Sequence, residues 1–257
     1  MTRLTESAIE DFAIKLFERL GYDYIHAPDI APDGDRPERS RYDEVLLTGR
    51  QEAALKRINP KLSPALLQAG LKEVQRNHSP ELLANNEAFH RLLTEGVPVS
   101  AHKDGDERGE RVWLIDFANP ANNEFVVANQ FTVIGHSDGG GHQNKRPDLV
   151  LFVNGIPLVV IELKNAADEN ATIKAAYQQL ETYKQAIPSL FTSNALVVIS
   201  DGLEAKAGSL SAGYSRFMSW KSADGKAEAS HLVSQLEVLI NGMLNKATLL
   251  DLLRHFI

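Results

Sequence analysis

One stretch of the sequence, residues 146–164, constrains the fold more than any other part of the chain. It contains two apolar runs, Leu149–Val153 and Leu158–Ile161, on either side of Asn154-Gly155. An Asn-Gly pair between two apolar runs is the typical signal of a β-hairpin with a tight turn. The sequence therefore predicts two adjacent antiparallel strands, buried along most of their length.

Three charged residues lie at the ends of these strands, opposite the turn. Asp148 precedes the first run, and Glu162 and Lys164 follow the second. Buried strands rarely end in two carboxylates and an amine, because each charge has to lose its hydration. We therefore expect these three side chains to form a site at the open end of the hairpin.

The geometry of the turn decides whether the three side chains share a face of the sheet. A two-residue loop in a regular ladder pairs Asp148 with Ile161, which sends the Glu162 side chain to the opposite face. A three-residue loop, or a β-bulge in either strand, pairs Asp148 with Glu162 instead. Lys164 then lies on the same face, two residues further along. We predict the longer loop or a bulge.

Composition narrows the class of protein. The chain has 257 residues, 43% of them apolar, which is enough for one large domain. It has no cysteine, so disulfides, thiolate zinc sites and cysteine nucleophiles are excluded, and we expect a cytoplasmic protein. No segment resembles a signal peptide or a membrane span. The formal charge of −7 argues against a large basic nucleic-acid surface but allows a local basic groove.

The order of the expected elements predicts an α/β fold: a central mixed β-sheet with flanking helices and an inserted helical block. Strands are expected at Val112–Phe117, Glu124–Val133 (interrupted at Asn129-Gln130) and Ala195–Ile199, besides the hairpin. Helices are expected at Glu6–Leu20, Gln51–Ile58, Ser63–Asn77, Ser79–Glu95, Ala171–Ile187, His231–Leu244 and Thr248–Ile257. We predict a core of about 1–25 and 110–220 within a single domain, with the helical insertion at about 45–95.

The charges of the hairpin suggest a specific chemistry. Two carboxylates one strand apart offer the oxygen ligands that Mg²⁺ prefers, and such an ion retains water that can attack a phosphate. Lys164 can orient that water or neutralise the charge that develops on the phosphate. Gln179 and Tyr183, four residues apart on the next helix, can hydrogen-bond to the same groups. No Gly-x-Ser-x-Gly or His-Glu-x-x-His motif competes with this interpretation.

Two other segments can contribute to the site. Glu6 and Glu10 lie one turn apart on the first helix, where they are either solvated flanking carboxylates or, for one of them, part of the site. Residues 137–146 are predicted to form a glycine-rich loop with a basic end. It is either a solvated turn or a segment that contacts a polyanion through Lys145 and Arg146. No Gly-Lys-Ser/Thr follows the glycines, which argues against a nucleotide P-loop.

The order Pro147-Asp148, then Glu162-Leu163-Lys164, resembles the PD-(D/E)xK nuclease superfamily. Residues 146–165 look more specifically like the N-terminal nuclease region of the restriction (R, motor) subunit of type I restriction-modification enzymes. Gln179-x-x-x-Tyr183 matches an additional motif of that family. Further likeness lies in Pro188-Ser-Leu-Phe191, Asn194, Ser200-Asp-Gly202 and Arg216-Phe-x-x-Trp220. The resemblance covers residues 110–257 well, the first helix loosely, and the 45–95 block not at all.

The resemblance implies a Mg²⁺-dependent endonuclease that cleaves double-stranded DNA. It assigns Asp148, Glu162 and the Leu163 carbonyl to metal binding and Lys164 to catalysis. Gln179 and Tyr183 position the substrate or the metal-bound water. An acidic residue on the first helix often joins such sites, and we expect Glu10, with Glu6 in reserve. Lys145 and Arg146 are the expected DNA contacts.

The resemblance also implies partners. In the family, the same subunit carries ATP-dependent motor domains and works with methyltransferase and specificity subunits, and the whole enzyme uses S-adenosylmethionine. We expect this chain to be a fragment whose C-terminal helices, 231–257, lead toward the motor. Two alternatives remain at this stage. One is a non-catalytic docking module of the complex, and the other is a stand-alone PD-(D/E)xK repair or junction nuclease.

Overall fold

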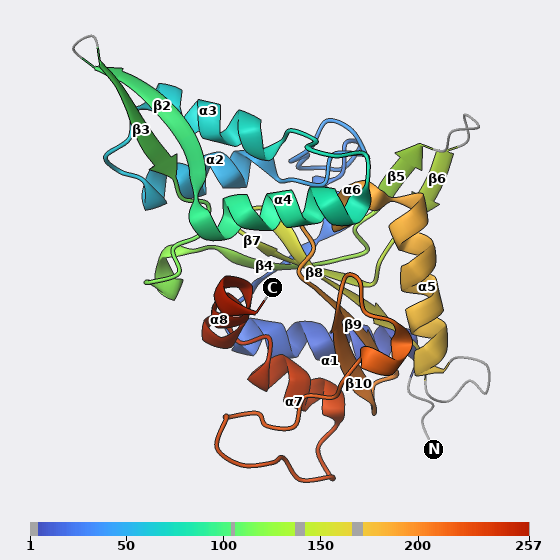
Figure 1. Cartoon of the computed structure of the whole chain (residues 1–257). Coiled ribbons are helices and arrows are strands. Elements are labelled where there is room, and N and C mark those ends of the chain that lie inside the picture. Colours follow the sequence, from blue (N-terminus) through green and yellow to red (C-terminus); the bar gives the residue numbers. More distant parts are fainter. Residues whose placement is uncertain (1–4, 104–105, 137–141, 166–171, 257) are drawn as a thin grey trace.

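The computed structural model describes residues 5–103, 106–136, 142–165 and 172–256 (Figure 1). Its centre is a six-stranded sheet in the order β1-β4-β7-β8-β9-β10. The β1/β4 and β8/β9 pairs are parallel and the other pairs are antiparallel, so the predicted mixed sheet is confirmed. The strands are β1 (Asp23–His26), β4 (Phe125–Asn129), β7 (Leu149–Val153), β8 (Ile156–Leu163), β9 (Leu196–Ser200) and β10 (Ala205–Ser209).

Helices cover both faces of this sheet, as expected for an α/β fold. The α1 side carries α1 (Glu6–Arg19), α7 (Gln235–Gly242) and α8 (Lys246–His255), and the α5 side carries α5 (Ile173–Ala186) and α6 (Pro188–Phe191) (Figure 1). Each side has its own apolar core, to which the buried central strands contribute alternate residues. The two cores together bury β7 and β8 completely.

The predicted helical block is present as α2 (Thr48–Ile58), α3 (Pro64–Val74) and α4 (Leu82–Glu95). Its apolar residues, such as Leu55, Leu71 and Phe89, join the core on the α1 side. A two-stranded hairpin, β2 (Val97–Lys103) and β3 (Asp106–Val112), follows and projects from the body of the molecule (Figure 1). The division of the chain into a core and an inserted block stays a prediction. Short 3-10 helices lie at Ala27–Ile30, Pro120–Asn122 and Tyr214–Arg216.

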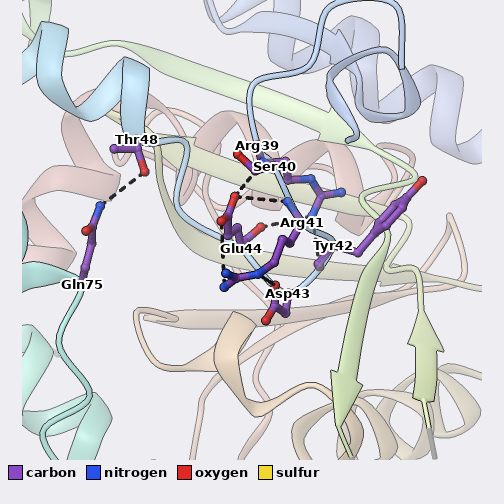
Figure 2. A network of polar contacts seen from close by, with 8 residues as sticks. All are labelled: Arg39, Ser40, Arg41, Tyr42, Asp43, Glu44, Thr48 and Gln75. Atoms are coloured by element: carbon purple, nitrogen blue, oxygen red, sulfur yellow. Dashed lines mark hydrogen bonds and ion pairs between the residues drawn. The ribbon is translucent and has the colours of Figure 1, made fainter. Parts of the chain in front are cut away.

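A polar network organises the connector that leads into α2 (Figure 2). The Arg39 guanidinium donates to the carbonyls of Tyr42, Glu44 and, at 2.7 Å, Thr132. Burial lowers the pKa of Arg39 to about 10. Because an arginine keeps its charge well above neutral pH even so, these carbonyls solvate a buried cation. Arg39 thus ties the connector to the segment that follows β4.

The prediction of a strand at Val112–Phe117 is wrong. Strand β3 ends at Val112, and the side chain of Asn59 takes over the backbone groups of Trp113. Its Oδ1 accepts from the Trp113 N–H at 2.8 Å and its Nδ2 donates to the Trp113 carbonyl at 2.9 Å. A tertiary contact from α2's C-cap therefore replaces the ladder bonds that a continuing strand needs.

Six of the strands in the described ranges were not expected. Strands β2 and β3 form a hairpin ahead of the predicted Val112–Phe117 strand, where none was expected. Residues 133–145 contain a second hairpin, β5 (Val133–His136) and β6 (His142–Lys145), where a loop was predicted at 137–146. The three glycines of that loop lie outside the described residues. The outer strands β1 and β10 were also missed, because they are short and, unlike the central strands, include exposed residues. None of the helices in the described ranges is long and apolar enough to span a membrane.

Candidate active site

A tight turn and a β-bulge together set the register of the central hairpin. Asn154 (φ 52°) and Gly155 (φ 77°) both have positive φ, as a two-residue type I′ loop requires. Val153 pairs with Ile156, but Leu151 pairs with Val159, so Leu158 is an extra residue on β8. The predicted bulge is confirmed, and the alternative of a longer loop is wrong.

The bulge moves the charged end of β8 to the α5 side. Leu158 and Val159 are adjacent in sequence, yet both belong to the core on the α1 side. Beyond the bulge, Ile161 and Leu163 continue on that side, so the side chains between and after them, Glu162 and Lys164, point to the α5 side. Without the extra residue both charges would face α1.

Asp148 reaches the same side from the neighbouring strand. Leu149 pairs with Ile161 and belongs to the α1-side core, so Asp148 stands beside Glu162 on the α5 side. Its Oδ2 accepts a hydrogen bond from the Leu163 N–H at 2.6 Å. Asp148, Glu162 and Lys164 therefore share one face of the sheet, as predicted.

Lys164 holds two of the atoms that were predicted to bind metal. Its Nζ donates to Glu162 Oε1 at 2.7 Å and to the Leu163 carbonyl at 2.9 Å. The Glu162 side chain is fully buried, and its Oε2 has no hydrogen-bond partner among the described residues. A buried carboxylate oxygen without a partner is rare in native proteins and usually has a functional explanation.

The pKa values of both carboxylates are raised. Burial, reinforced by the charge of Asp148, raises the pKa of Glu162 to about 8, although Lys164 acts in the opposite direction. Burial also raises the pKa of Asp148 to about 6, against the effects of the Leu163 N–H and Lys164. Burial lowers the pKa of Lys164, but the neighbouring Glu162 outweighs it and the net shift is upward. Two like charges are thus confined with a single cation, an arrangement that a divalent cation would relieve.

The predicted pair on α5 faces the same place. The Gln179 Nε2 donates to Tyr183 Oη at 2.5 Å, and Tyr183 Oη donates to the Arg146 carbonyl at 3.4 Å. Burial and the charge of Glu162 raise the pKa of Tyr183, so this phenol remains protonated at neutral pH. Helix α5, which carries the pair, starts at Ile173, and the Thr172 side chain caps it by accepting from the Ala175 N–H.

These residues surround a cavity of about 820 Å³. Asp148, Gln179 and Tyr183 line it, whereas Glu162 and Lys164 are not among the lining residues. Lys145 and Arg146, the predicted DNA contacts, line it as well and form no ion pair with another described residue. Acidic groups and unpaired basic groups therefore meet in one concave surface.

Both candidate glutamates of the first helix line this cavity, but only one is fixed in it. Glu6 is exposed, near the start of α1. Glu10 accepts from Asn129 Nδ2 at 2.7 Å and from Gln130 Nε2 at 3.0 Å. Sequence reasoning missed Asn129 and Gln130 as members of the site. The signal that would have found them was the polar break they make at the end of an apolar strand.

The atoms available to a metal ion in this site are oxygens. No group of three or more His, Cys, Asp or Glu side chains in the described ranges converges on one metal position. Asp148, the free Oε2 of Glu162 and the Leu163 carbonyl are all oxygen donors, and Mg²⁺ commonly binds one or two carboxylates while retaining several waters. The residues present therefore fit a hydrated Mg²⁺ and do not fit a metal that needs nitrogen or sulfur ligands.

Most of the chain matches the model of a known protein family. Residues 3–216 match the model for the N terminus of the type I restriction enzyme R protein. The chain belongs to this family. The matched segment contains the whole constellation around the hairpin, and also the α2–α4 helices, in which no family motif was recognised.

Two relatives illustrate the likeness. The type I restriction enzyme HindI endonuclease subunit of Haemophilus influenzae is 34% identical over 256 residues, covering 99% of this chain and 24% of the relative. A Methanocaldococcus jannaschii protein, provisionally named the type I restriction enzyme MjaIXP endonuclease subunit, is 32% identical over 265 residues. The match covers 97% of this chain and 25% of the relative. The chain thus spans about a quarter of the length of these relatives.

Proposed function

We propose that this chain is the nuclease part of a type I restriction enzyme R subunit and hydrolyses phosphodiester bonds of double-stranded DNA. The observation that carries the proposal is the convergence of Asp148, Glu162 and Lys164 at one end of a bulged hairpin, beside an 820 Å³ cavity. Family membership supports it, since the relatives are named as endonuclease subunits.

In this proposal Asp148, Glu162 and the Leu163 carbonyl hold Mg²⁺. The ion would supply an activated water and offset negative charge on the phosphate. Burial is the contribution of the protein: it keeps Glu162 away from bulk water, so its unpartnered Oε2 has a strong preference for a cation. The Leu163 N–H fixes the orientation of the Asp148 carboxylate.

Lys164 has two roles in the proposal. Its Nζ, 2.7 Å from Glu162 Oε1, balances the buried carboxylate, and the same ammonium would stabilise charge that develops on the scissile phosphate. Gln179 and Tyr183 orient the phosphate or the attacking water through their amide and phenol. Both are donors that face the cavity and are linked to each other, which fixes their positions.

Lys145 and Arg146 are proposed to bind the DNA backbone. Both line the cavity: Lys145 is the last residue of β6, and Arg146 follows it two residues before Asp148. Contacts of this kind position the duplex without reading its sequence. Such a role is compatible with the net charge of −7, because site selection and most DNA affinity would then reside in other domains and subunits. ATP-driven motor domains in the same subunit, and methyltransferase and specificity subunits, are the proposed partners.

The decisive test is cleavage of supercoiled plasmid with and without Mg²⁺ by the wild type, Asp148→Ala and Lys164→Ala. Lys184→Ala is a matched control, since Lys184 also pairs with a glutamate but lies away from the hairpin. We expect cleavage by the wild type and the control only. If none of the proteins cuts, the comparison is repeated in the reassembled, ATP-supplied complex. Equal cleavage by wild type and both site variants there would refute the assignment and favour a docking module.

A further inference from the structure

Residues Asn129 and Gln130 at the end of β4 connect two of the elements that build the site. Each donates its side-chain amide to a different oxygen of the Glu10 carboxylate, at 2.7 Å and 3.0 Å. A carboxylate held through both oxygens cannot rotate, yet each oxygen retains a second lone pair for another ligand. The two amides therefore fix the orientation of Glu10 at the wall of the cavity without exhausting its capacity to bind.

The main chain of Gln130 reaches the other side of the site. The Gln130 N–H donates to the Asp148 carbonyl at 3.1 Å, while the side-chain amide of the same residue donates to Glu10. A single residue thus bonds to both Glu10 and Asp148, which lie far apart in the sequence. Asn129 is oriented in turn by Tyr24, whose Oη donates to Asn129 Oδ1 at 3.1 Å and leaves the amide nitrogen for Glu10.

The backbone conformation of Gln130 is unusual. Among the described residues, Gln130 (φ 58°) and Asn154 (φ 52°) are the two non-glycine residues with positive φ. Asn tolerates this left-handed conformation, whereas Gln does so less readily and glycine would adopt it freely. Strained backbone of this kind is concentrated at functional sites, where the surrounding structure maintains it.

We propose that Gln130 is a positioning residue of the metal site, which holds the Glu10 carboxylate next to Asp148 so that both act on the same cation. The inference rests on the proposed function and deepens it. Gln130 itself touches neither metal nor substrate in this account. It acts through Glu10 by its side chain and through Asp148 by its main chain. In this account a glutamine occupies this strained position because its side-chain amide holds Glu10, and not because it stabilises the local backbone.

The test measures Mn²⁺ binding by calorimetry on the 257-residue chain, together with thermal unfolding in EDTA. The Gln130→Gly variant keeps the N–H, relaxes the backbone and removes the amide. We expect it to be at least as stable as the wild type and to bind Mn²⁺ about tenfold more weakly, the scale typical of residues that orient metal ligands. Gln130→Met, of similar size but without the donor, is expected to lose affinity to the same extent.

Asn154→Gly is the matched control, because Asn154 has the same backbone conformation at the far end of the hairpin. Its amide bonds to the Leu114 carbonyl at 2.9 Å and its Oδ1 accepts from the Glu124 N–H at 2.8 Å. Losing these bonds should lower the unfolding temperature and leave Mn²⁺ affinity unchanged. If Gln130 has only a structural role, Gln130→Gly should likewise lower the unfolding temperature and leave Mn²⁺ affinity unchanged. The proposed role predicts unchanged or higher stability and weaker Mn²⁺ binding.

A double-mutant cycle with Glu10→Ala decides whether Gln130 acts through Glu10. In that background Gln130→Gly should cause no further loss of Mn²⁺ affinity. A full additional loss, or wild-type affinity in Gln130→Gly and Gln130→Met, would overturn the inference. Asp148→Asn tests the proposed metal site separately from the role of Gln130. If this variant retains wild-type Mn²⁺ binding, the metal site of the proposed function is wrong, whatever the effect of the Gln130 variants.

Discussion

Replacing the buried Glu162 by glutamine should make the metal-free protein more stable at neutral pH. The Glu162 carboxylate is fully buried, stands beside Asp148, and has an oxygen without a hydrogen-bond partner. Glutamine has the same shape and no charge, so Glu162→Gln removes the cost of burying an anion. The wild type retains this cost because, in our proposal, a cation needs the charge.

The magnitude follows from the raised pKa of Glu162. Its ordinary pKa is 4.5 and its value in the folded protein is about 8. A raised carboxyl pKa means that stability is fully present below the unfolded-state pKa and declines as pH rises toward the folded-state pKa. At pH 7 the loss amounts to about 3 kcal/mol at 1.36 kcal/mol per pH unit. This figure already includes the favourable charge-assisted bond from Lys164, which acts to lower the pKa.

We therefore expect Glu162→Gln to gain about 3 kcal/mol at pH 7, equivalent to a rise of about 9 °C in the unfolding temperature. The assay is thermal unfolding in EDTA between pH 4.5 and 8, where the advantage of the variant should grow from near zero. Glu181→Gln is the matched control, since Glu181 also pairs with a lysine at 2.6 Å but is 41% exposed. It should change stability by less than about 0.5 kcal/mol. A pH-independent advantage, or a less stable Glu162→Gln at pH 7, would refute the reasoning.

Three further predictions concern the turn, the connector and the basic residues. Gly155→Ala should cost at least about 1 kcal/mol in chemical denaturation, because φ is +77° and the new Cβ would lie 2.5 Å from the N-cap carbonyl of α2; an unchanged midpoint would contradict the turn geometry. Asn59→Ala should lower the free energy of unfolding by about 2 kcal/mol, because it leaves the Trp113 backbone groups unpaired. A loss no larger than that caused by a typical surface substitution would argue against this contact. Replacing Lys145 and Arg146 by alanine should weaken DNA binding equally for all sequences, and fluorescence anisotropy should show a salt dependence lower by about one unit per residue. An unaltered salt dependence would exclude both residues from the DNA contact.

The sequence by itself determined the central hairpin, the class of fold and the residue types of the site. Apolar runs around Asn154-Gly155 specify two buried strands, because the turn signal and the alternation are both local. The charges at the strand ends are also local facts, since no buried strand accommodates Asp148, Glu162 and Lys164 without a reason. The apolar stripes likewise predicted α1 and the α2–α4 block closely.

Only the tertiary structure decided which face of the sheet the charges occupy and what holds them there. The sequence left the longer loop and the bulge open, because a one-residue change of register depends on how β8 packs against both cores rather than on the turn alone. The contacts of Asn59 with Trp113, and of Gln130 with Glu10, join residues more than 50 positions apart. Local patterns carry no information about such partners, so the Val112–Phe117 strand was wrongly predicted and the role of Gln130 was not foreseen.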